Sequence, residues 1–124
     1  GKFSNIHSID LSVPADATQD DLKAIIKLKQ NVLDSDKQWS GWIKLTSAQL
    51  QAVDKIAAIK DPQHWLVDMS DTTAKTTMAV LLKSYQTMAT KVNGLMVDDS
   101  GYGASDIAAL RHAVFLGEFP SIIK

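Results

Sequence analysis

The segment from residue 71 to residue 93 most restricts the fold, because its large apolar residues recur with the spacing of a packed helix. Six of them follow one another at intervals of four, three, four, three and four positions: Ala74, Met78, Leu81, Tyr85, Met88 and Val92. This heptad-like seam is the period of helix–helix packing. Asn93 and Gly94 follow it and supply a C-terminal stop. The pattern predicts one long helix that packs against other helices.

Two further segments begin with a capping box, in which a Ser or Thr and a polar residue three positions later bond to each other's backbone. Thr18 with Asp21 and Thr46 with Gln49 fit this pattern, and an apolar stripe follows each pair. We expect helices to begin at both threonines. The residues before Gly117 carry a similar stripe, which predicts a last helix over residues 106–116.

The remaining segments carry mixed signals. Ile9, Leu11 and Val13 alternate with Asp10 and Ser12, which is typical of a short strand. The run "DPQHWLVDM" contains three residues that favour a strand, but Asp followed by Pro is the usual start of a helix. We expect a short helix over residues 62–69.

Together these elements predict a mainly α fold, a compact bundle of four to five helices with a short extended N-terminal segment. The alternative is an α+β fold with short strands near residues 8–13, 41–45 and 64–69. A chain of 124 residues is long enough for one domain, so residues 1–124 are expected to form a single domain.

Composition excludes several classes of partner and chemistry. The net charge is −1, and Arg111 is the only arginine among the thirteen basic residues. Arginine is the usual reader of phosphate and guanine, so we expect no nucleic-acid partner. No apolar run approaches the roughly 18 to 20 residues that span a bilayer, so no membrane span is expected. The chain has no cysteine, which excludes disulfides and thiolate-bound metals.

The two tryptophans in "DKQWSGWIKL" are the strongest candidates for a binding surface. Trp39 and Trp42 lie three residues apart in the predicted connection between two helices, and two aromatic rings on a loop can form a platform for a sugar or an anchor for a protein. Since Ile43 and Leu45 follow Trp42, we interpret Trp42 as part of the core and Trp39 as surface. Tyr102 is a third candidate binding residue.

Two other places resemble reactive sites. The loop "DDSGYGASD" could bind calcium through Asp98, Ser100 and Asp106, but Ala109 stands where a calcium-binding hand needs a bidentate carboxylate. The interpretation is therefore a solvated turn. His64 and Asp68 would share one face of a helix over residues 62–69, but no further metal ligands follow them. We expect a local hydrogen bond there.

The sequence contains no motif that identifies a reaction, and we expect no cofactor. The prediction is a non-catalytic binding or assembly module, such as an accessory subunit, an inhibitor or immunity-type protein, or a component of a larger particle. It would act through a protein contact surface near Trp39, with homo-oligomer formation as a further possibility. The alternative is a small metal-dependent hydrolase that uses His64, Asp68 and the loop over residues 98–106.

Overall fold

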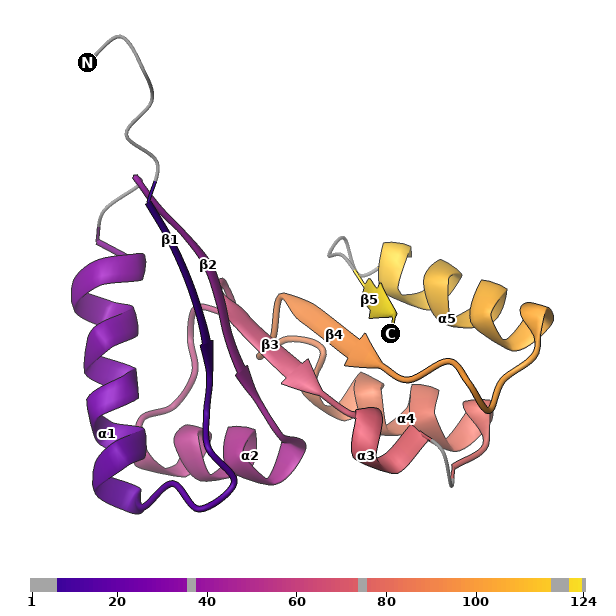
Figure 1. The fold of residues 1–124 in the computed structure, drawn as a ribbon, viewed down its shortest axis with the longest axis horizontal. Coiled ribbons are helices and arrows are strands. Elements are labelled where there is room, and N and C mark those ends of the chain that lie inside the picture. The colour runs from indigo at the N-terminus through magenta and orange to yellow at the C-terminus, as the bar shows by residue number, and fades with distance from the viewer. Residues whose placement is uncertain (1–6, 36–37, 74–75, 117–120, 124) are drawn as a thin grey trace, which may run out of the picture.

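The fold alternates strands and helices along the whole chain (Figure 1). The computed structural model describes residues 7–35, 38–73, 76–116 and 121–123. Its elements in chain order are β1 (His7–Ser12), α1 (Gln19–Leu28), the π-helical turn η1 (Lys29–Leu33), β2 (Trp39–Leu45), α2 (Ser47–Ile56), β3 (Trp65–Asp68), α3 (Ser70–Thr73), α4 (Met78–Met88), β4 (Gly94–Val97), α5 (Ala104–Leu116) and β5 (Ser121–Ile123).

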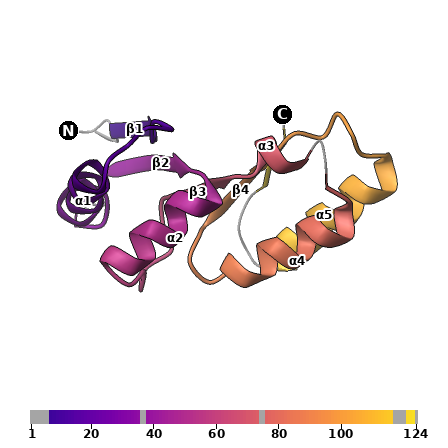
Figure 2. The ribbon, with the colours of Figure 1, turned by 90° about the horizontal axis from the view of Figure 1, so that it is seen from below.

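The five strands form one parallel sheet in the order β1-β2-β3-β4-β5. Parallel neighbours need a crossover between them, and such crossovers are almost always right-handed. When strands follow one another in chain order, crossovers of one hand place every helix on the same face of the sheet. Figure 2 shows this directly, because the four longer helices α1, α2, α4 and α5 all lie on one side of the strands. The arrangement is that of an α/β solenoid, in which each unit packs mainly on its neighbours.

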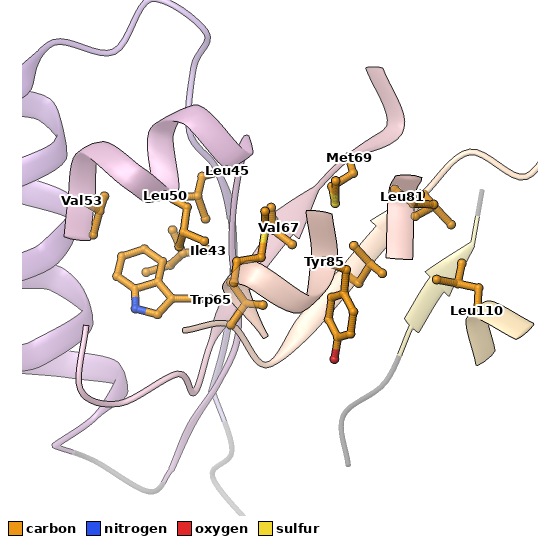
Figure 3. Close-up of a cluster of buried hydrophobic side chains, with 14 of the residues drawn as sticks. Ile43, Leu45, Leu50, Val53, Trp65, Val67, Met69, Leu81, Tyr85 and Leu110 are labelled. Atoms are coloured by element: carbon orange, nitrogen blue, oxygen red, sulfur yellow. The ribbon is translucent and has the colours of Figure 1, made fainter. Parts of the chain in front are cut away.

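The hydrophobic core fills the layer between the sheet and the helices. Ile43, Val67 and Leu95 on three neighbouring strands are fully buried there, as are Leu50 on α2 and Leu81 on α4. Figure 3 shows the labelled side chains as one continuous row along the sheet. Each such side chain contributes roughly 1.5 to 3 kcal/mol when it leaves water. The core therefore joins the successive units into one body.

The prediction of a mainly α helical bundle is wrong. The alternative fits better, because strands β1, β2 and β3 lie at the three places that it named. Residues 65–68 form a strand and not the helix expected over residues 62–69. The Asp–Pro pair of residues 61 and 62 starts no helix here, because the apolar run after it pairs with β2 on one side and β4 on the other.

The long helix predicted over residues 71–93 is also wrong in extent. Helix α4 ends at Met88, and the chain turns back to enter β4 at Gly94. Five residues of the predicted seam are nevertheless buried: Met78, Leu81, Tyr85, Met88 and Val92. Ala74 lies outside the described residues. A seam with this spacing marks one buried face of a helix, and here that face packs into the core layer between the sheet and the helices.

Both capping boxes are confirmed. The Thr18 hydroxyl accepts the Asp21 N–H at 3.1 Å, and the Asp21 carboxylate accepts the Thr18 N–H at 2.9 Å. Thr46 and Gln49 make the same pair of bonds at the start of α2. These bonds satisfy N–H groups that have no partner inside the helix. The last predicted helix is confirmed as well, as α5.

A buried lysine fastens the end of the first helical segment to the loop before β3. Lys29 is 4 % exposed, and its Nζ donates to both carboxylate oxygens of Asp34, at 3.1 and 2.9 Å, and to the Asp61 carbonyl at 3.1 Å. The same ammonium lies 5.4 Å from the ring centre of Trp65. A buried cation is tolerated only when its donors are satisfied in this way. These contacts give Lys29 a structural role.

A second ion pair connects α2 to the turn after α4. Asp54 on α2 accepts a hydrogen bond from the backbone N–H of Ile59 at 2.9 Å and forms an ion pair with Lys91. The Ile59 N–H, and after it Lys91, hold the pKa of Asp54 below its ordinary value of 3.8. A lowered pKa in the folded state means that the ionised carboxylate stabilises the fold.

We expect Leu81→Ala to lower the free energy of unfolding by about 2 to 5 kcal/mol, because it removes a fully buried side chain and leaves a cavity. The neighbouring Val80, which is 54 % exposed, provides the matched control. Val80→Ala is expected to change stability by less than about 0.5 kcal/mol. Urea unfolding followed by circular dichroism measures both, and equal effects would contradict this placement of α4.

We expect Asp54→Asn to cost about 0.5 to 1 kcal/mol of stability at neutral pH, because the charge that pairs with Lys91 is lost. The stabilisation is fully present above the ordinary pKa of the carboxyl and disappears as the pH falls through its lower folded value. The variant and the wild type should therefore converge in strong acid. Urea unfolding across a pH series tests this, with Asp16→Asn in the exposed turn after β1 as control. A constant difference at every pH would rule out the ionised pair as its cause.

Candidate binding site on the open face of the sheet

The face of the sheet opposite the helices carries a different set of side chains from the core face. In β1 the burial alternates, so that Ile9 and Leu11 pack against the core while Ser8, Asp10 and Ser12 are exposed. Successive side chains of a strand point to opposite faces. Register then identifies the open-face residues of the next strands, since Asp10 pairs with Trp42 and Ser12 with Lys44.

The two tryptophans of β2 lie on opposite faces, because they are three positions apart in a strand. Trp39 packs against the core cluster, and its ring centre is 4.7 Å from that of His7 on β1. Trp42 is not a member of the core that the described residues form. The expected roles are thus exchanged. The prediction of a surface Trp39 and a core Trp42 was wrong because the segment was read as a loop and not as a strand.

The Trp42 indole reaches across β3 toward β4. A side-chain carbon added to Gly94 would lie 3.0 and 3.1 Å from ring atoms Cζ3 and Cη2 of Trp42, and 2.9 Å from Cδ1 of Leu66. Leu66 is 4 % exposed although it stands outside the core cluster. Trp42 and Leu66 therefore form a small apolar contact on the open face, and Gly94 leaves the room for it.

Gly41 allows β2 to lie close to β1 beside this contact. Its φ is +125°, and a side-chain carbon there would meet the Ile9 carbonyl oxygen at 1.8 Å. No other residue type can occupy such a position without moving the backbone. The glycine between the two tryptophans is thus a requirement of strand pairing and not the sign of a tight turn.

A hollow opens beside Trp42 on this face. It is lined by side chains and backbone from β1, from β2 and from the segments that lead into β3 and β4: Ser8, Asp10, Ser40, Gly41, Trp42, His64 and Asn93. Its residues come from four successive units of the fold. The sheet pairing brings them together, since neighbouring strands lie about 4.8 Å apart.

Two polar side chains in the hollow have defined orientations. The Nδ1 atom of His64 is 2.9 Å from the Gly41 carbonyl oxygen. The Asp10 carboxylate accepts a hydrogen bond from the backbone N–H of Trp42 at 3.3 Å. His64 has a φ of 71°. Positive φ is uncommon in residues other than glycine and is concentrated at functional sites. The site therefore combines an aromatic face with a carboxylate and an imidazole.

Tyr102, the third predicted binding residue, does not line this hollow. Its hydroxyl donates to the Thr76 carbonyl at 2.6 Å, and its ring packs against the core cluster. Burial, and to a smaller degree the nearby Asp106 carboxylate, raise the pKa of Tyr102 above its ordinary value. In the structure Tyr102 fastens the loop after β4 to the segment before α4.

Neither of the two candidate reactive places is assembled in the structure. Asp98 accepts the Ser100 N–H at 3.0 Å, as expected for a turn. His64 precedes β3 and Asp68 ends it, so they are four positions apart along an extended segment, or roughly 13 Å. Within residues 7–35, 38–73, 76–116 and 121–123, no group of three or more His, Asp or Glu side chains could hold a metal ion.

Sequence reasoning named Trp42 and His64 but missed Asp10 and Asn93 as their neighbours. A signal for Asp10 was present, because it is a polar member of the alternating strand and must lie on the face opposite Ile9 and Leu11. Nothing local to the sequence indicates that this position pairs with Trp42.

In comparisons with known proteins, no family model matches this chain, and no curated protein sequence matches it. No helix in the described part of the chain is both long enough and apolar enough to cross a bilayer. The geometry of the open face therefore carries the functional argument.

We expect Gly94→Ala to lower stability by about 1 to 3 kcal/mol, because the added methyl group meets Leu66 and Trp42 at about 3 Å and displaces them. Gly103→Ala is the matched control, since nothing lies within 4 Å of its added methyl group. Thermal unfolding measures the cost, and the indole N–H resonance of Trp42 reports the displacement. An unmoved resonance in Gly94→Ala would contradict the placement of Trp42 over β4.

Proposed function

We propose that the chain is a non-catalytic binding or assembly module that contacts a protein partner through the open face of its sheet. The observation behind this proposal is that Trp42 lies on the face of the sheet opposite the four longer helices α1, α2, α4 and α5. Tryptophan is among the residues most enriched in the energetic centres of protein interfaces. The sequence indicated a contact surface near Trp39. The proposed surface instead lies around Trp42, on the opposite face of β2.

The surroundings of Trp42 support a contact surface. Leu66, which lies near the indole, is almost fully shielded from solvent. The exposed polar residues of β1 lie beside Trp42 and Leu66. An apolar centre with a polar rim is the usual composition of an interface. Solenoid folds commonly bind their partners through one extended face, because their units repeat along it.

The alternative of a metal-dependent hydrolase finds no support in this geometry. His64, Asp68 and the loop over residues 98–106 do not converge on one point, and the described residues contain no metal-binding cluster.

Site-specific photocross-linking tests the proposal. The photoreactive residue p-benzoylphenylalanine is placed at Ser40, which is exposed beside Trp42, and in a control protein at Val80, which is exposed on the helix side. We expect a defined cross-linked protein from an extract of the source cells at position 40 and none at position 80. Excess unlabelled wild-type chain should compete, and Trp42→Ala should compete at least tenfold less well, because a hot-spot residue is worth about 2 kcal/mol or more.

Trp42→Ala uncovers Leu66, so Trp42→Leu serves as a second variant that keeps an apolar cover on it. Thermal unfolding first establishes that each variant is folded. Equal cross-linking at both positions, or full competition by both Trp42 variants, would overturn the proposal.

A further inference from the structure

We infer that the hollow beside Trp42 binds the guanidinium group of an arginine presented by the partner protein. This inference rests on the proposed function and names the chemistry of its central contact. It is drawn from the acceptors that line the hollow, from the aromatic face beside them, and from the lack of a cationic side chain in the lining.

The first acceptor is the Asp10 carboxylate. One of its oxygens accepts a hydrogen bond from the backbone N–H of Trp42 at 3.3 Å, and a carboxylate can accept hydrogen bonds from further donors. The ion pairs in the described part of the chain join Lys29 to Asp34 and Lys91 to Asp54, so neither neutralises Asp10. Asp10 therefore places a negative charge in the hollow that a ligand cation can pair with.

The second acceptor is Nε2 of His64. A carbonyl oxygen can only accept, so the 2.9 Å contact between His64 Nδ1 and the Gly41 oxygen requires the proton on Nδ1. In the neutral imidazole Nε2 then carries a lone pair and no proton. The bond to β2 also fixes the direction of the imidazole, and the positive φ of His64 is a conformation that the surrounding structure must maintain.

The third component is the Trp42 ring. It reaches past Leu66 toward Gly94, and Trp42 lines the same hollow as the first two acceptors. A cation placed over such a ring within about 6 Å is attracted by its electron-rich face. Register places Asp10 next to Trp42, and His64 immediately precedes the residue that pairs with Ile43.

Arginine fits these three components better than lysine does. Its guanidinium is planar, stacks on aromatic faces and carries five N–H donors in a fixed fork, so it can contact the carboxylate, the imidazole and the ring together. The lining residues Ser8, Asp10, Ser40, Gly41, Trp42, His64 and Asn93 include no lysine or arginine that would compete. The only arginine of this chain, Arg111, lies on α5, two strand–helix units away from Trp42 on β2.

Titration of the ¹⁵N-labelled full chain with three blocked tripeptides tests the inference. The peptides are acetyl-Gly-Arg-Gly-amide, its citrulline analogue, which has the same shape without the charge, and its lysine analogue. We expect saturable shifts of the Trp42 indole N–H and the Asn93 side-chain amide with the arginine peptide. The citrulline peptide should bind about tenfold more weakly, because charge-assisted hydrogen bonds are lost.

Asp10→Asn should weaken binding of the arginine peptide about tenfold, whereas Asp16→Asn, which removes the same charge from an exposed turn outside the hollow, should leave it unchanged. His64→Asn tolerates positive φ and removes the Nε2 acceptor, so it should also weaken binding. Equal effects of Asp10→Asn and Asp16→Asn would show that only net charge matters and would overturn the site.

Other occupants give distinct results. Equal binding of the arginine and citrulline peptides, or shifts with a neutral disaccharide and not with the arginine peptide, would overturn the guanidinium assignment. Self-association that Arg111→Lys abolishes would overturn the assignment to a different protein and identify a second copy instead. If the arginine peptide fails to bind at tens of millimolar while cross-linking from Ser40 succeeds, the inference fails and the proposed function stands. If it binds and no protein is cross-linked, the proposed function fails.

Discussion

Burial of one face of the parallel sheet against the helices is the constraint on which the rest of the structure depends. Ile43, Val67 and Leu95 lie at the centre of that face and are fully buried. Because the strands follow one another in chain order, right-handed crossovers send the helices to the same side. The core is therefore one layer thick, and none of the four longer helices covers the opposite face. That asymmetry decides where a contact surface can form.

The open face has its own limited packing, and it centres on one tryptophan. Trp42 lies next to Leu66 on this face. Gly41 allows β2 to pair closely with β1, and Gly94 leaves space for the indole. A parallel strand is usually covered on both faces, so its outer apolar residues need some cover. Trp42 supplies that cover near Gly94 and also lines the hollow together with Asp10 and His64. Stability and recognition thus use the same side chain.

The capped helix starts were predictable, and the alternative named the places of β1, β2 and β3, whereas β4, β5 and the pairing of the strands into one sheet were not predicted. Capping boxes at Thr18 and Thr46 involve contacts within one turn, so residue types alone indicate them. Strands β3 and β4 have four residues each, too few for a period to distinguish strand from helix. The repeat was hidden as well, because paired positions such as Leu11 and Ile43 are 32 residues apart, while Ile43 and Trp65 are 22 apart. Such unequal spacing leaves no fixed period to detect.

The sequence by itself determined where the two capped helices α1 and α2 begin, which residues are apolar enough to form a core, and that Trp39 and Trp42 merit attention. Each of these depends on interactions between residues close in the chain. The tertiary structure alone decided that Trp42 turns away from the core, and that it meets Asp10, His64 and Asn93. Those residues belong to separate units, and hydrogen bonds between strands bring them together. A one-residue change of register would send every side chain of a strand to the other face, so local patterns cannot specify such a site.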